Sequence, residues 1–85
     1  MDLSDWRARI DTVDQLLVDL LNRRMRYALA IGEIKRKGDQ QIFDPAREQE
    51  VIEAVKGYNE GPMSAAAIEE IFARIMREAR ELEAH

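Results

Sequence analysis

The 85-residue chain has no cysteine, one histidine, two prolines and no long apolar run. Without cysteine it can form neither a disulfide framework nor a thiolate nucleophile, and we expect a cytoplasmic protein. The single histidine, His85, leaves no pair of ligands at a metal-binding spacing, so we expect no metal site. No stretch approaches the roughly 20 apolar residues of a membrane span, and the first residues lack the basic start of a signal peptide.

Charge and length narrow the class of protein further. A formal net charge of -4 disfavours bulk attraction to nucleic acid or to an anionic membrane. The length suits a single domain over residues 1–85, close to the size at which one hydrophobic core is only marginally sufficient. We therefore expect help from a partner chain.

Glycine and proline gather at two places, 38–45 and 57–62, with Gly32 as the exception. The distribution predicts an all-α fold with helices at about 4–37, 45–57 and 64–83. Ser4 is the expected N-cap of the first helix. Asp44 and Pro45 are expected to cap and open the second.

The first predicted helix carries a heptad seam with one interruption, Arg24. Such a helix is about 50 Å long, too long for two short helices to cover. We therefore expect an intertwined helical homodimer, in which the third helix supplies a covering apolar face. The seam residues are Leu3, Trp6, Ile10, Val13, Leu17, Leu20, Arg24, Tyr27, Ile31 and Ile34, and the covering face is Ile68, Phe72, Ile75, Ala79 and Leu82.

Arg24 stands where the seam requires an apolar residue, and a buried unpaired cation is destabilising unless an anion meets it. Taken alone, Arg24 could reach solvent or pair with a carboxylate on a facing helix. Lys35, eleven residues later, returns to within about 20° of the same face, although alone it could be a solvated helix end. Together the two cations suit a small anionic ring compound.

The junction before the second helix adds Asp44, Arg47 and Glu48. Capping accounts for Asp44, while Arg47 and Glu48 are equally compatible with an ordinary surface pair. Arg7 lies some 25 Å from Arg24 along the helix, so it can serve this pocket only from the other chain of a dimer.

Taken in order, these residues resemble the all-helical chorismate mutases, the AroQ class. The resemblance covers nearly the whole chain: Arg7 within Trp6-Arg7-Ala8-Arg9-Ile10-Asp11, Arg24 within Leu20-Leu21-Asn22-Arg23-Arg24, Lys35 after Ile31-Gly32-Glu33-Ile34, and Asp44-x-x-Arg47-Glu48. It implies cofactor-free conversion of chorismate to prephenate in phenylalanine and tyrosine biosynthesis, and allows fusion to another enzyme of that pathway.

The resemblance also implies roles for these residues. Arg24 and the partner subunit's Arg7 would grip the two carboxylates, with Arg47 nearby. Lys35 would donate to the ether oxygen, and Glu48 with the Asp44 backbone would hold the ring hydroxyl.

Two positions depart from the family pattern. Ala79 stands where a small polar residue is common, and Glu83 stands where many members have a glutamine that donates to the ether oxygen. An ionised carboxylate can only accept, so Glu83 would need a proton to help, and activity should fall as the pH rises. The alternative for Glu83 is a frayed, solvated helix end.

Two other functions remain open at this point. An isochorismate-pyruvate lyase of the same fold needs a similar arginine clamp and lysine. A non-catalytic helical dimerisation or regulatory module fits the seam but leaves Arg24 unexplained. A nucleic-acid-binding coiled coil is disfavoured by the negative charge.

Overall fold

The computed structural model describes all 85 residues and contains three helices and no strand. They are α1 (Leu3–Lys37), α2 (Pro45–Tyr58) and α3 (Ala65–Glu83). The predicted all-α fold is confirmed, and the predicted helix ends lie within one residue of those observed.

The cap of α1 was predicted wrongly. The N-cap is Asp2, not Ser4, which lies inside the first turn. Asp2 and Asp5 form a reciprocal capping box, in which each carboxylate accepts the backbone N–H of the other residue at 3.0 Å. Two backbone donors are satisfied in this way, which a cap at Ser4 could not match.

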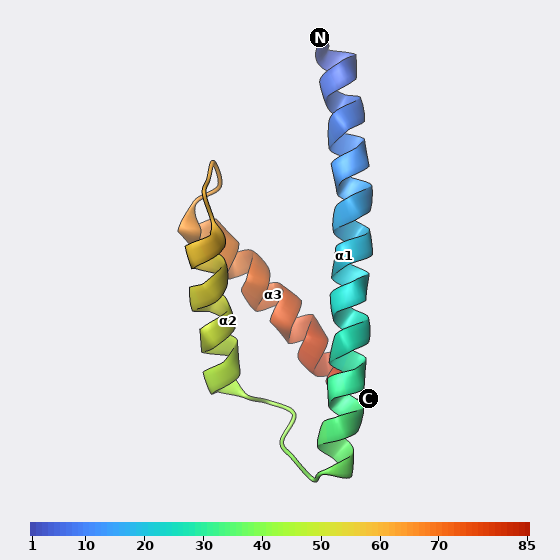
Figure 1. Cartoon of the computed structure of the whole chain (residues 1–85), viewed down its shortest axis with the longest axis vertical. Helices are drawn as coiled ribbons and strands as arrows, with labels where there is room; N and C mark the ends of the chain where they lie inside the picture. The colour runs from blue at the N-terminus through green and yellow to red at the C-terminus, as the bar shows by residue number, and fades with distance from the viewer.

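The helices form an open, elongated arrangement rather than a closed bundle (Figure 1). α1 is a straight rod along the 55 Å long axis, and its N-terminal half projects free of the other two helices. α3 runs obliquely between α2 and the C-terminal part of α1, and it is the only helix that contacts both of the others.

Close packing is confined to the places where α3 meets its neighbours. Only five residues are buried, Ala28 and Gly32 on α1, Ile52 on α2, and Met76 and Ala79 on α3. Four of the five are small or flexible side chains, which let the helices approach closely. A core of this size cannot by itself account for an 85-residue fold.

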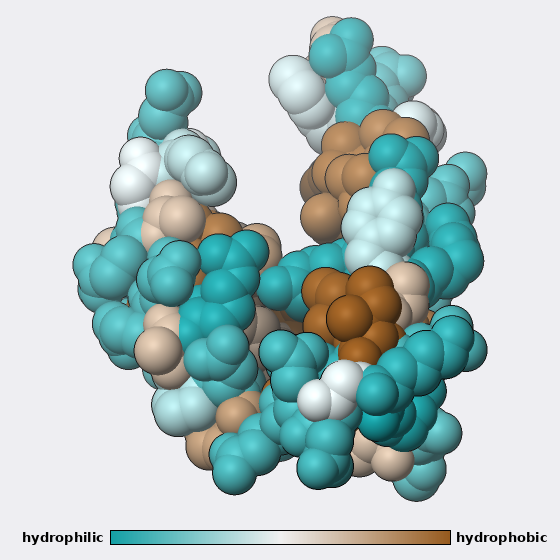
Figure 2. All heavy atoms as spheres, turned by 60° about the horizontal axis from the view of Figure 1, so that its bottom comes forward, coloured by the Kyte–Doolittle hydropathy of each residue, from teal (hydrophilic) through white to brown (hydrophobic).

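The seam of α1 is not covered within one chain. Its nine apolar residues keep between 45% and 65% of their surface exposed, because α3 packs against the neighbouring face that carries Ala28 and Gly32. Apolar atoms accordingly reach the surface in large groups on the α1 side of the molecule (Figure 2). Exposed apolar patches of this kind mark interaction surfaces.

None of the three helices has an apolar stretch long enough to cross a membrane.

Candidate active site

A cavity of about 100 Å³ lies between the C-terminal half of α1, the loop before α2, the start of α2 and the end of α3. It brings together every predicted site residue except Arg7. Its lining consists of Arg24, Lys35, Ile42, Asp44, Arg47, Glu48, Val51, Met76, Ala79, Arg80 and Glu83.

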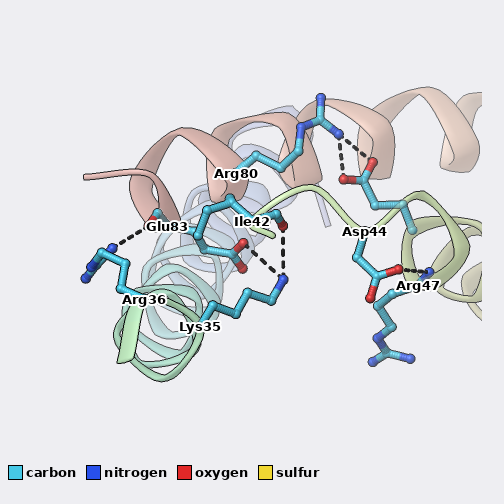
Figure 3. Close-up of polar contacts among 8 residues, drawn as sticks. Lys35, Arg36, Ile42, Asp44, Arg47, Arg80 and Glu83 are labelled. Carbon is cyan, nitrogen blue, oxygen red and sulfur yellow. Dashed lines mark hydrogen bonds and ion pairs between the residues drawn. The ribbon is translucent and has the colours of Figure 1, made fainter. Parts of the chain in front are cut away.

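Lys35 reaches from α1 into this cavity and is not a solvated helix end (Figure 3). Its Nζ donates to the backbone oxygen of Ile42 at 3.0 Å and lies 3.7 Å from Oε2 of Glu83. The side chains of Lys35 and Glu83 are only 19% and 12% exposed. Glu83 is therefore not a frayed helix end either.

Arg24 lines the same cavity from α1, as the eleven-residue spacing from Lys35 predicts. It is half-buried, and none of the five ion pairs in the chain includes it. Within one chain, Arg24 therefore pairs with no carboxylate. Its positive charge remains available to a ligand.

The start of α2 is built as its sequence predicts. Asp44 is the N-cap, its Oδ1 accepts the backbone N–H of Arg47 at 3.0 Å, and Pro45 occupies the first turn. Arg47 lines the cavity, but its guanidinium contacts Glu50 at 3.4 Å in solvent. Glu48 points instead toward α3 and forms an ion pair there.

The partner of Glu48 is Arg80, a residue that the sequence analysis missed. Arg80 Nη1 donates to both carboxylate oxygens of Glu48 (Figure 3), and its guanidinium lies 4.8 Å from the ring centre of Phe43. Helical spacing contains a signal that could have found it, because Arg80 precedes the predicted site residue Glu83 by three residues and so shares a helix face with it.

The end of α3 is held tightly against α1. A Cβ atom on Gly32 would lie 2.8 Å from both Cα and the backbone oxygen of Glu83, so only glycine permits this crossing. Arg36 donates to the same Glu83 backbone oxygen and so caps the helix end. One turn earlier, Ala79 is buried at 6% exposure and contributes a methyl group to the cavity wall.

Arg7 is exposed on the free half of α1 and does not line the cavity. Seventeen residues of helix separate it from Arg24, which is about 25 Å. Within one chain, Arg7 therefore cannot reach the ligand that Arg24 would bind.

The cavity combines four cationic and three acidic side chains with an apolar wall. Glu48 and Glu83 are each held by a cation, whereas Arg24 and Arg47 have no partner inside the cavity. Forked guanidinium groups bind carboxylates through paired hydrogen bonds. The arrangement suits a small ligand that carries carboxylate groups and a polar group for Glu48.

The family model of type II chorismate mutases matches residues 6–84. The chain belongs to this family. The resemblance in its sequence is thereby confirmed.

The curated relatives of this chain are longer than the chain itself. It is 35% identical over 77 residues to the bifunctional chorismate mutase/prephenate dehydratases of Neisseria gonorrhoeae and Aquifex aeolicus. The match covers 91% of this chain and 21% of each relative. The chain thus spans about a fifth of the length of these proteins.

Solved chorismate mutases match the chain over most of their length. Form II of the enzyme from Thermus thermophilus superimposes with a TM-score of 0.95 at 26% identity, covering 98% of this chain and 94% of that one. The chorismate mutase of Helicobacter pylori, solved in complex with prephenate, gives 0.88 at 28% identity, covering 96% and 89%.

Proposed function

We propose that this chain is a chorismate mutase, which converts chorismate to prephenate by a Claisen rearrangement without a cofactor. The observation that carries the proposal is the convergence of Arg24 and Lys35 on one cavity, opposite Glu48, in a chain of the type II family. The two cations are eleven residues apart on one helix and both line a cavity of about 100 Å³.

The chemistry of the rearrangement matches what these side chains can supply. A pericyclic step needs no nucleophile, no proton transfer and no redox carrier. The protein has to hold the flexible substrate in its compact reactive conformer, which removes part of the entropic barrier. It also has to place fixed positive charge where negative charge develops as the carbon–oxygen bond breaks.

Each predicted residue then has a distinct role. Arg24 binds one substrate carboxylate with Arg47 nearby, and Lys35 donates to the ether oxygen in place of its present contacts with Ile42 and Glu83. Glu48 accepts the ring hydroxyl, helped by the backbone at Asp44. Glu83 contributes a donor only when protonated, and Ala79 offers shape but no hydrogen bond.

The site is completed, in this proposal, by a second copy of the chain. The exposed seam of α1 gives a homodimer its interface, and Arg7 enters the cavity of the other subunit to bind a carboxylate. Each dimer then holds two shared sites, and residues 1–85 act as one cytoplasmic chorismate mutase domain. Fusion of relatives to prephenate dehydratase supports association or fusion with another enzyme of aromatic biosynthesis.

The direct test follows the loss of chorismate and the appearance of prephenate in buffer that contains a chelator and no added cofactor. Turnover under these conditions supports the proposal. Pyruvate release from isochorismate, without prephenate from chorismate, would assign the lyase activity instead.

Substituting Lys35 tests whether the cavity is the reaction site. Lys35→Ala removes the cation at the breaking bond, and we expect kcat to fall by about a hundredfold or more, with a smaller change in KM. Lys37→Ala is the matched control, because Lys37 is exposed on the last turn of the same helix and does not line the cavity. A non-catalytic module would tolerate both substitutions equally.

A further inference from the structure

We infer that Arg80 is a positioning residue, which acts on the substrate only through Glu48 by fixing the direction of its carboxylate. The inference rests on the proposed function, since it concerns the group that Glu48 holds. Arg80 is absent from the set of residues that the family resemblance supplies.

The contact between the two side chains is more enclosed than the chain's surface ion pairs. Arg80 and Glu48 have side chains that are 32% and 24% exposed, whereas Arg47 and Glu50 are 66% and 68% exposed. A charge-assisted hydrogen bond gains strength as water is excluded from it. Both oxygens of Glu48 accept from the same nitrogen, which fixes the carboxylate with respect to α3.

Arg80 is itself held by a third element. Its guanidinium lies over the ring of Phe43, in the loop that leads from α1 to the cap of α2. α1 and α2 do not contact each other directly, so their relative placement depends on α3 and on this loop. Arg80 ties α3, the loop and the start of α2 together at the cavity wall.

This arrangement leaves Glu48 able to bind substrate. An ionised carboxylate has about four lone-pair sites, and Arg80 occupies two of them. The remaining sites can accept a hydroxyl hydrogen from the cavity side. The charge of the Arg80 guanidinium is matched by the Glu48 carboxylate and its plane lies over Phe43, so we assign it to Glu48 rather than to a substrate carboxylate.

The test is a double-mutant cycle with Arg80→Met, Glu48→Gln and both together, measured as kcat/KM for chorismate. We expect Arg80→Met to lower kcat/KM about tenfold, and the double variant to lose no more than Glu48→Gln alone. Arg77→Met is the matched control, because Arg77 is exposed on the same helix and does not line the cavity. It should remain within about twofold of the wild type.

A second substrate separates positioning from a general effect on folding. For a chorismate analogue that lacks the ring hydroxyl, Glu48 has nothing to accept, so Arg80→Met should leave its turnover nearly unchanged. Circular dichroism and thermal unfolding of each variant check the fold. If Arg80→Met unfolds, Arg80→Lys takes its place, because it keeps the positive charge but lacks the planar guanidinium that lies over Phe43.

Three results would overturn the inference. The first is a wild-type kcat/KM in a folded Arg80 variant, and the second is an equal loss of kcat/KM for both substrates. The third is a double variant whose loss of kcat/KM equals the product of the losses in the two single variants. Multiplied losses would place Arg80 in direct contact with the substrate. A wild-type chain that neither binds nor converts chorismate would instead contradict the proposed function, and this inference with it.

Discussion

Glu83 places an acidic side chain beside Lys35, where positive charge is expected to stabilise the breaking bond. Lys35 lies 3.7 Å from its carboxylate, Arg36 from α1 binds its backbone oxygen, and Arg24 lines the same cavity. When ionised, Glu83 attracts the lysine that the reaction needs and repels negative charge developing on the ether oxygen. When protonated, it can donate to that oxygen.

Replacing Glu83 with an amide should therefore change the pH profile. We expect wild-type kcat to be lower at alkaline than at acid pH, because an ionised Glu83 can only accept a hydrogen bond, and Glu83→Gln to depend less on pH and to be about tenfold faster at alkaline pH. The measurement is kcat against pH for both proteins. Glu81→Gln, an exposed change on the same helix, serves as control, and an unchanged profile in Glu83→Gln would disprove the assignment.

At the scale of single elements, the crossing of α3 over α1 decides where Glu83 lies. Gly32 allows backbone contact there, since any Cβ would meet the Glu83 backbone at 2.8 Å. The neighbouring buried residues, Ala28 and Ala79, are small as well. The two helices therefore approach closely enough for Lys35 and Glu83 to meet.

Substituting glycine by alanine at two sites tests this crossing. Gly32→Ala should lower the free energy of unfolding by about 1–3 kcal/mol through overpacking, and should also reduce kcat because Glu83 is displaced. Gly57→Ala in α2 has nothing within 4 Å of the new methyl group and should stabilise the protein by up to about 1 kcal/mol. Denaturant unfolding and steady-state kinetics check both, and equal stability in the two variants would contradict the close crossing.

The sequence predicts the elements well because their signals are local. Glycine and proline mark the loops, Asp44 and Pro45 mark the start of α2, and helical spacing places Arg24 and Lys35 on one side of α1. Contacts between helices are not predicted by such local signals. The pairing of Glu48 with Arg80 depends on how α2 and α3 are set against each other, and the need for glycine at position 32 depends on the crossing angle of α1 and α3.

For the whole molecule, the decisive observation is that one chain buries only five residues while the seam of α1 stays exposed along its length. Burial of one large aliphatic side chain contributes about 1.5–3 kcal/mol, so pairing the seams of two chains would supply much of the missing stability. The same pairing would also let Arg7 of one chain take part in a site with Lys35 of the other.

Mixing two inactive variants tests this shared site. Arg7→Ala and Lys35→Ala should each be nearly inactive, but a mixed dimer contains one site with Arg7 from one chain and Lys35 from the other. Random re-association at equal concentrations should restore about a quarter of the wild-type activity, since half of the dimers are mixed and each has one intact site. No recovery after joint unfolding and refolding would contradict the shared site.

The exposed seam also bears on how freely the sequence of α1 can vary. In a two-fold assembly of identical chains, one codon specifies both sides of the contact, so a single substitution alters the interface at two places at once. A polar residue that a solvent-exposed helix would tolerate would then be buried twice, and its unfavourable effect on assembly would be doubled. The face of α1 that is most accessible in one chain should accordingly be among the least tolerant of mutation.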